Sequence, residues 1–257
     1  MYPHKNRSEL DALLEKHFND YLNSHYPHHQ RNKDHSYILC DQYEPEESLL
    51  LENRGLFTKH VKSYIDVHSK GNMKSSQLMT LDLFLPYIDN IKNVRNIIPI
   101  KEEIKSIQFE VIFSDYSHID VFMLTIENKK IIIEVKYKEE IFDRVDSLNS
   151  RRINKYLNAY RNINKLMTKK EVSQNDFFED YQLFRNIYNT FNDELGKPGY
   201  FFVVTTKMNV DIINSFNQFA YRLEHLYGFT FIDRIKMIFI EDMNLSNSFI
   251  EKYVLIK

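Results

Sequence analysis

The chain has 257 residues, enough for one large domain or for a domain with an extension. Its 34 basic and 36 acidic side chains nearly cancel, so no overall positive field draws in nucleic acid and a local basic patch would be needed. The single cysteine excludes an internal disulfide framework, and no apolar run suits a signal peptide or a membrane span, so we expect a cytoplasmic protein with no membrane partner.

The first predicted element is an amphipathic helix over Ser8–Tyr26. Its apolar side chains form one stripe: Leu10, Leu13, Leu14, Phe18, Tyr21 and Leu22. The following segment, His25–His35, holds four histidines without cysteine pairs or regular helical spacing, which favours a solvated loop or interface segment over a zinc site. We predict an N-terminal helical extension over residues 1–43 and one main domain over residues 44–257.

Two more helices are predicted before the first strand. One covers Glu46–Val67, because acidic residues follow Pro45 in its first turn. The other begins at Ser75 or Ser76, which can cap it, and is ended or kinked by Pro86.

Two apolar, β-branched runs, Ile119–Ile126 and Lys130–Tyr137, flank a short polar break and predict a β-hairpin. Both runs are apolar on both faces, which is typical of central strands covered by helices. They nevertheless contain Asp120, Glu134 and Lys136, ionisable groups that are costly to bury without a partner. We therefore expect these three residues to have a functional role.

The register of this hairpin decides whether the three polar groups meet. A three-residue turn at Glu127–Lys129 would place Phe122 opposite Glu134 and would bring all three groups onto one face. In that register Asp120 lies opposite Lys136. A two-residue turn would move Asp120 to the other face. The chemical interpretation therefore requires the longer turn or a bulge.

Two converging carboxylates repel each other and raise each other's pKa unless a cation lies between them. Mg²⁺ prefers oxygen ligands and keeps several waters, so Asp120, Glu134 and the backbone carbonyl of Val135 could form half of its coordination shell. Mn²⁺ could substitute. Lys136 would lie beside the ion, where it can orient an attacking water or neutralise charge on a phosphate. The sequence therefore predicts a metal site for phosphodiester chemistry.

The strand before the hairpin is predicted over Ile107–Phe113 and carries Glu110. Glu110 is either a third carboxylate for the same ion or a surface acid on an edge strand, and both interpretations stay open. Gln77, in the first turn of the third helix, is interpreted as a structural residue in preference to a support for the site.

A basic helical segment is predicted over Arg144–Lys170, after the hairpin. Its cations are Arg144, Arg151, Arg152, Lys155, Arg161, Lys165, Lys169 and Lys170, with Tyr156 and Tyr160 between them. Arg151, Arg152 and Lys155 make this segment the best candidate for a surface that follows nucleic-acid phosphates. A run of charge is equally typical of a solvated helix face.

The remaining predicted elements alternate between helix and strand. A helix over Asn175–Leu195 is stopped by a Gly-Lys-Pro-Gly segment, and Gln182 and Arg185 share one of its faces. Tyr200–Thr206 is expected to be a buried strand in parallel pairing. A helix over Asp211–Tyr227 with Gly228 as its C-cap follows, and Arg234–Glu241 and Tyr253–Ile256 supply one or two last strands.

The pattern D-x13-E-x-K on a hairpin resembles the PD-(D/E)XK, or restriction-endonuclease-like, nuclease superfamily. His118–Ile119 stand where the family's name has a proline. Three further segments are similar to motifs of one bacterial branch: Ser75–Ile88, Phe109–Glu110 and Gln182–Asn186. This chain has Asp82 where that branch usually carries asparagine.

The resemblance implies an α/β fold with an αβββαβ core, in which helices flank a central mixed sheet. It also implies that Asp120 and Glu134 hold Mg²⁺ while Lys136 assists the attack of water on a phosphodiester. By the same resemblance, Gln182 is a fourth residue of the catalytic site and Arg185 faces the scissile phosphate.

Many nucleases of this superfamily place an acid from the first helix near the metal, and Glu47 and Glu52 are the candidates here. Acids at a helix N-terminus also complement the helix dipole, and we favour that interpretation.

We therefore predict a metal-dependent nuclease acting on DNA in preference to RNA, a choice that rests on the habit of the resembled family. Residue usage rich in Asn, Ile, Lys and Tyr indicates an AT-rich bacterial or phage genome. A defence or mobile-element role would be unsurprising for a bacterial gene of this kind. The alternative is a non-catalytic nucleic-acid- or protein-binding module on a nuclease-like scaffold. The intact triad argues against this alternative, and the near-neutral charge argues for it. A homodimer and a partner protein both stay open.

Overall fold

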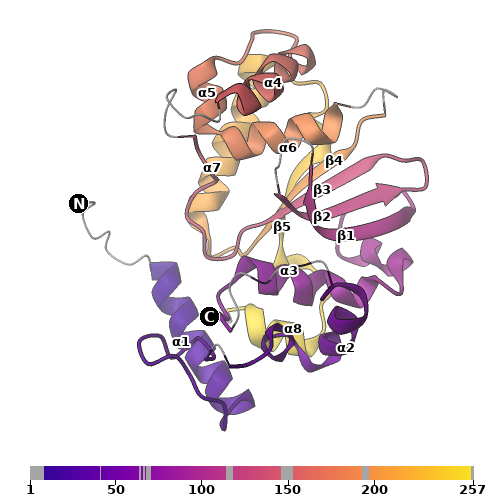
Figure 1. Cartoon of the computed structure of the whole chain (residues 1–257). Helices are drawn as coiled ribbons and strands as arrows, with labels where there is room; N and C mark the ends of the chain where they lie inside the picture. The colour runs from indigo at the N-terminus through magenta and orange to yellow at the C-terminus, as the bar shows by residue number, and fades with distance from the viewer. Residues whose placement is uncertain are drawn as a thin grey trace.

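A five-stranded mixed sheet forms the centre of the computed structural model, which describes residues 9–40, 42–63, 65, 67, 71–113, 118–145, 153–192 and 197–255. The strands follow one another across the sheet in chain order, antiparallel from β1 to β3 and parallel from β3 to β5 (Figure 1). Their bounds are β1 Ile104–Ile112, β2 His118–Thr125, β3 Lys130–Val135, β4 Tyr200–Thr205 and β5 Ile235–Phe239. The predicted α/β fold with a central mixed sheet is confirmed.

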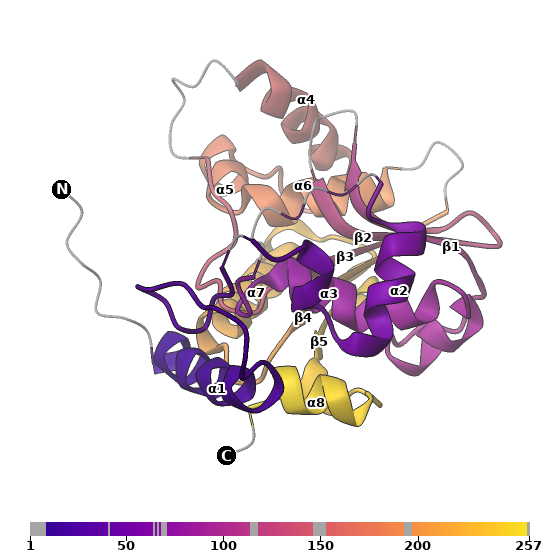
Figure 2. The ribbon, with the colours of Figure 1, turned by 60° about the horizontal axis from the view of Figure 1, so that its bottom comes forward.

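Helices cover both faces of the sheet, as the apolar strands require. One layer contains α1 Glu9–His25, α2 Leu51–His60, α3 Ser76–Phe84 and α8 Asn247–Tyr253, and the other contains α4 Ile153–Ile163, α5 Gln174–Glu179, α6 Tyr181–Phe191 and α7 Val210–Tyr221 (Figures 1 and 2). Successive residues of β3 alternate between two hydrophobic clusters, with Ile131 and Ile133 toward α3 and Ile132 toward α6. The two clusters hold the sheet between the helical layers.

The hairpin register differs by two residues from the predicted one. Phe122 pairs with Ile132 and not with Glu134. The turn lies one residue earlier than predicted, because Thr125 donates its backbone N–H to the carbonyl of Lys129 over 3.0 Å and accepts from the backbone N–H of Asn128, whose φ is 62°, over 2.9 Å. A shift of two residues preserves the face to which each side chain points, so Asp120 and Glu134 remain on the same side of the sheet.

The N-terminal helix is confirmed with one exception in its apolar stripe. Leu14 and Phe18 are fully buried, whereas Leu13 is 37% exposed. The helix contributes to the same hydrophobic cluster as α3 and α8. The domain boundary at residues 43 and 44 stays a prediction.

Two predicted helices are shorter than expected, and the first of them, α2, ends at His60 where Val67 was predicted. The segment after Pro45 forms a 3₁₀ turn, Pro45–Ser48, and the α-helix begins only at Leu51 because Leu49 and Leu50 are extended and buried. The predicted basic helix is observed as α4 followed by a 3₁₀ turn, Asn164–Leu166, while residues 146–152 lie outside the described residues.

Two further predictions about the C-terminal half are wrong. The helix predicted over Asn175–Leu195 is divided into α5 and α6 at Asp180, whose backbone leaves the helical region with ψ of 33°. The strand predicted to begin at Tyr253 is absent from the described residues, because Tyr253 is instead the last residue of α8. The Ser246 side chain caps α8 by accepting from Phe249.

The other predicted elements are close to those observed. The helix after β4 continues from α7 into a π-helical turn, Arg222–Tyr227, and ends at Gly228, which has the predicted positive φ, 70°. Ser75 is the N-cap of α3. No helix among the described residues is long and apolar enough to cross a membrane.

Candidate active site

Asp120 lies on β2 and is held against β3 by a backbone hydrogen bond. Its Oδ2 atom accepts from the backbone N–H of Val135 over 2.7 Å. Burial raises the pKa of Asp120 well above its ordinary value, and the nearby carboxylate of Glu134 raises it further, while Lys136 opposes the shift. The hairpin thus brings two carboxylates together in a poorly solvated place.

Glu134 is buried at the end of β3, receives hydrogen bonds from two side chains and forms an ion pair with a third. Its Oε1 atom accepts from Gln182 over 2.7 Å and lies 3.1 Å from the ammonium nitrogen of Lys136. Its Oε2 atom accepts from Asn186 over 3.1 Å. The carboxylate is therefore fixed in orientation by β3 and α6 together.

Lys136 is also buried, and its backbone N–H donates to the carbonyl of Val204 over 2.9 Å. Burial alone would lower the pKa of the Lys136 ammonium, but Glu134 and Asp120 outweigh this effect and raise the pKa above its ordinary value. Lys136 is therefore a cation held beside two carboxylates and suited to stabilising negative charge.

Gln182 joins α6 to the segment that follows β3. Its side-chain oxygen accepts from the backbone N–H of Asp143 over 3.0 Å, and its backbone N–H donates to the carbonyl of the same residue over 3.3 Å. Its amide nitrogen is thereby directed to Glu134. The structure places Gln182 beside the triad, as the resemblance implies.

Asn186 is a residue of this site that sequence reasoning missed. It lies four residues after Gln182 on α6, a spacing that places both side chains on one helix face. Its side-chain oxygen accepts from the guanidinium of Arg185, with N–O distances of 3.2 and 3.3 Å. The signal was present in the segment Gln182–Asn186, where Gln182, Arg185 and Asn186 are polar residues that share one helix face.

Glu110 lies on β1 with an unusual backbone conformation. Its φ is 48°, in the left-handed region that side-chain-bearing residues rarely adopt. Its Oε1 atom accepts from the amide of Gln77 over 3.1 Å, and its Oε2 atom is 4.0 Å from Nδ1 of His118. Gln77, which was interpreted as structural, therefore holds the third candidate carboxylate.

The donor set fits a hard divalent cation with few protein ligands. Asp120 and Glu134 each keep acceptor capacity beyond the hydrogen bonds described above, because an ionised carboxylate has about four lone-pair sites. Burial first, and the carboxylate of Glu134 second, raise the pKa of Asp120, so a further positive charge beside the two acids would be favourable. Within the described ranges, no group of three or more His, Cys, Asp or Glu is placed to hold one ion, so a role for Glu110 as a third ligand stays a prediction.

The two candidate acids of the helix predicted over Glu46–Val67 contact other parts of the molecule. Glu47 lies 3.4 Å from Nε2 of His29, and Glu52 accepts from the hydroxyl of Ser248. Glu52 lies in the first turn of α2, where the favoured interpretation puts it beside the helix dipole, whereas Glu47 lies in the 3₁₀ turn before that helix. The histidine segment forms a loop, and none of its described residues belongs to a group that could hold a metal ion.

The predicted nucleic-acid contacts are only partly visible. Arg151 and Arg152, together with the side chain of Lys155, lie outside the described residues. Arg185 is buried, donates to the carbonyl of His118 over 3.4 Å and lies over the ring of Tyr181. Its contact with nucleic acid stays a prediction.

The two tyrosines of the basic segment pack inward. Tyr156 makes an edge-to-face contact with Tyr181, and Tyr160 makes one with Phe177. Both therefore stabilise the packing of α4 on α5 and α6, and they are not arranged as a platform for bases.

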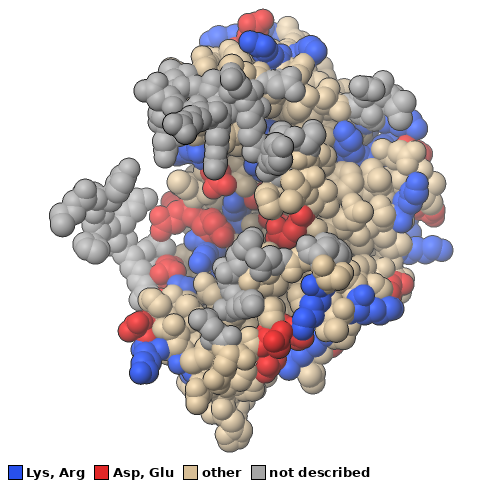
Figure 3. Space-filling view, viewed as in Figure 1, with Lys and Arg blue, Asp and Glu red and all other residues tan. Residues whose placement is uncertain are grey.

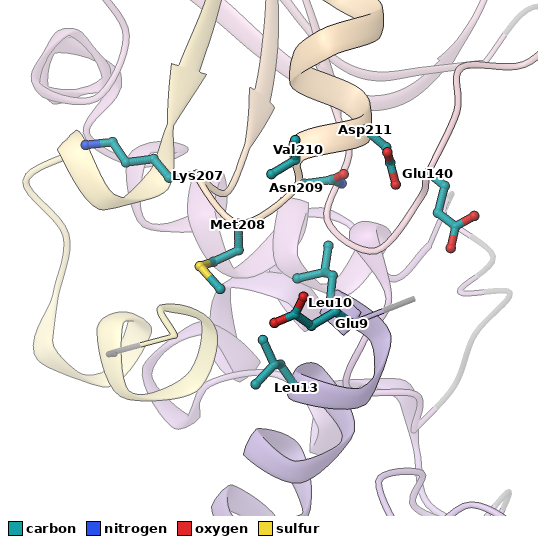
Figure 4. Close-up of a pocket in the computed structure, with 9 residues that line it drawn as sticks. All are labelled: Glu9, Leu10, Leu13, Glu140, Lys207, Met208, Asn209, Val210 and Asp211. Carbon is teal, nitrogen blue, oxygen red and sulfur yellow. The ribbon is translucent and has the colours of Figure 1, made fainter. Parts of the chain in front are cut away.

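A separate cavity of about 350 Å³ adjoins the segment that follows Lys136 (Figure 4). Leu10 and Leu13 of α1 face Met208 and Val210 across it, whereas Lys207 points away. Asn209 also lines the cavity, and its side chain donates to the carbonyl of Glu139 over 2.9 Å.

Acidic side chains gather around the middle of the molecular face shown in Figure 3. That face is therefore better suited to cations than to an uncompensated phosphate backbone.

A family model described as Restriction Endonuclease associating with ARP matches residues 11–245. No curated protein and no solved structure matches the chain. The matched span contains all five strands and the carboxylate site on β2 and β3.

Proposed function

Because the chain belongs to the restriction endonuclease family described as associating with ARP, we propose that it is a metal-dependent nuclease of the PD-(D/E)XK type. The observation that carries the proposal is the convergence of Asp120, Glu134 and Lys136 at one end of the hairpin, with Val135 N–H bonded to Asp120 and Lys136 paired to Glu134. The substrate class is nucleic acid, and DNA is the first choice.

The two carboxylates and the carbonyl of Val135 would hold Mg²⁺ or Mn²⁺. When bound, such an ion supplies Lewis-acid activation of water and stabilisation of the charge that develops at phosphorus. Asp120 and Glu134 supply the negative charge that binds the ion. The backbone bond from Val135 to Asp120 orients that carboxylate before the ion arrives.

Lys136 contributes a fixed positive charge. Its raised pKa keeps the ammonium protonated, so it can donate hydrogen bonds to a phosphate oxygen as negative charge increases there. Because the site is buried from solvent, the same charge is worth more there than it would be in water.

Gln182 and Asn186 position Glu134 and do not themselves carry out chemistry. Each donates one hydrogen bond to a different oxygen of the carboxylate. A site geometry held by side chains on a helix and a strand is more rigid than one held by loops. This rigidity supports a catalytic use of Glu134.

A second candidate function is a non-catalytic binding module on the same scaffold. Two observations favour it: the acidic side chains gathered on the face of Figure 3, and a net charge of −2, neither of which attracts nucleic acid. The family's description names an association with ARP. In this alternative the chain would act through a partner that supplies the nucleic-acid contacts.

The deciding experiment is a cleavage panel with plasmid, linear duplex, single-stranded DNA and RNA. Each substrate is incubated with Mg²⁺, Mn²⁺ or EDTA and with wild type, Asp120→Ala or Lys136→Ala. The nuclease proposal expects cutting that needs the ion and is lost in both variants. Cutting that is equal in the variants contradicts the site, and no cutting of any substrate favours the binding module.

A further inference from the structure

Thr205, at the end of β4, has a buried hydroxyl without a partner. The residue is fully buried, and its Oγ1 atom has no hydrogen-bond partner among the described residues. A buried polar group left unsatisfied costs about 1–3 kcal/mol. Native structures contain few such groups, and each calls for a physical explanation.

The strand register places Thr205 beside Lys136. In the parallel ladder of β3 and β4, Val135 pairs with Val204, and Lys136 donates its backbone N–H to the carbonyl of Val204 over 2.9 Å. One further step along both strands brings Lys136 and Thr205 to neighbouring positions.

Thr205 and Lys136 also point to the same face of the sheet. On β4, Val203 belongs to the hydrophobic cluster under α6 and Val204 to the opposite cluster, so Thr205 returns to the α6 side. On β3, Ile132 belongs to the α6 cluster, and Lys136 has the same alternation as Ile132. The unpaired hydroxyl of Thr205 therefore lies on the α6 side of the sheet, the side to which Lys136 also points.

Lys136 can use an additional acceptor. An ammonium group has three N–H donors. The oxygen atom beside it, Oε1 of Glu134, also accepts a hydrogen bond from Gln182. A divalent ion on Glu134 would compete with Lys136 for that carboxylate. The ammonium would then require another oxygen in its reach.

We propose that Thr205 is a positioning residue for Lys136. In the ion-loaded site the Thr205 hydroxyl oxygen accepts one N–H of the Lys136 ammonium and leaves the other donors for a phosphate oxygen. This inference rests on the proposed nuclease function. It explains why β4 carries a buried hydroxyl that the resting structure leaves unpaired.

The test compares wild type with Thr205→Val, which removes the hydroxyl at almost constant volume, and Thr205→Ser, which keeps it. Single-turnover and steady-state cleavage of the substrate found in the panel give kcat and KM. Thr205→Val should lose about tenfold to a hundredfold in kcat with KM within about twofold, because the interaction is made in the reacting complex. Thr205→Ser should stay within about threefold of wild type.

A structural role predicts a different result. If Thr205 only fills space, the valine variant keeps its kcat, and that outcome overturns the proposal. Equal losses in the serine and valine variants also overturn it, because they would reflect packing. The melting temperature in EDTA should not fall in Thr205→Val, since the substitution removes an unsatisfied polar group.

A readout without turnover separates this inference from the proposed function. The side-chain ¹⁵N signal of Lys136, assigned with Lys136→Met, is followed during titration with Ca²⁺ as a non-reactive ion. It should move to a new position in wild type and Thr205→Ser and to a different one in Thr205→Val. The same movement in all three proteins overturns the role of Thr205. If wild type cuts no substrate, the nuclease proposal fails and this comparison still decides the contact.

Discussion

Gln182 donates a hydrogen bond of 2.7 Å from its side-chain nitrogen to Oε1 of Glu134. The oxygen of the same amide accepts from the backbone of Asp143 over 3.0 Å, which leaves the nitrogen end of the amide directed at Glu134. The orientation of the candidate catalytic carboxylate is therefore set by a helix that begins nearly fifty residues later in the chain.

Gln182→Ala should weaken both stability and cleavage. Removing the amide leaves a buried carboxylate oxygen with one donor fewer, which should lower the free energy of unfolding by about 1–3 kcal/mol. Loss of orientation at Glu134 should reduce kcat by about tenfold or more. Urea unfolding and single-turnover cleavage measure the two effects. The control is Gln218→Ala, at an exposed position on α7. Matching results for the two variants would show that Gln182 has no special role.

Asp120→Asn should stabilise the protein when no divalent ion is present. The folded-state pKa of Asp120 is raised by burial and by Glu134, so the ionised group costs stability as pH rises above the ordinary value of about 3.9. The amide removes that cost and can still accept from Val135. In EDTA the variant should therefore melt above wild type at pH 7, with a difference that shrinks toward pH 4.

Added Mg²⁺ should reverse this order. The ion binds the folded wild type and raises its melting temperature, while Asp120→Asn gains little. Asp34→Asn, at an exposed position, serves as the matched charge control and should follow wild type. If Asp120→Asn melts below wild type in EDTA, the two carboxylates do not repel each other in the way that the account requires.

A buried ion pair joins the last helix to the third. Lys252 lies 2.7 Å from Oδ2 of Asp82, both side chains are inaccessible to solvent, and Tyr253 donates to the same oxygen over 2.8 Å. Asp82 is the position at which the resembled branch usually carries asparagine. Here the aspartate balances a lysine that would otherwise be buried as an isolated charge.

Asp82→Asn should therefore be strongly destabilising in this chain. Leaving Lys252 without its partner should cost about 3–5 kcal/mol of unfolding free energy. The double variant Asp82→Asn, Lys252→Met removes both charges and should recover much of that loss. Chemical denaturation of the three variants, including Lys252→Met alone, measures the coupling. Additive losses would mean that the pair is not coupled.

Much of the fold was predictable because hydrophobic patterns fix strands and their order. The apolar runs of β3 and β4 predicted buried strands, and the helical crossover between them predicted their parallel pairing. Gly228 indicated the end of a helix because glycine readily adopts the left-handed conformation in which many helices end, and its φ is indeed 70°. The face shared by Asp120 and Glu134 followed from the alternation of side chains along the hairpin.

The errors have local physical causes. The hairpin turn was predicted one residue too late because the sequence does not show that Asn128 would take a positive φ. The break between α5 and α6 depends on Asp180, which is buried and paired with Arg222 from a distant helical turn. Tertiary contacts of this kind override local helix patterns. Asn186 was missed because its role depends on how α6 faces β3.

The most direct test of the account is cleavage by Lys136→Met compared with Lys138→Met. The first substitution removes the ammonium beside Glu134, and the second removes a partly exposed cation of similar shape two residues away. With Mg²⁺ and the substrate that wild type cuts, we predict that Lys136→Met loses about a hundredfold or more in single-turnover rate. Lys138→Met should remain close to wild type. Equal rates for Lys136→Met and wild type would contradict the assignment of this site.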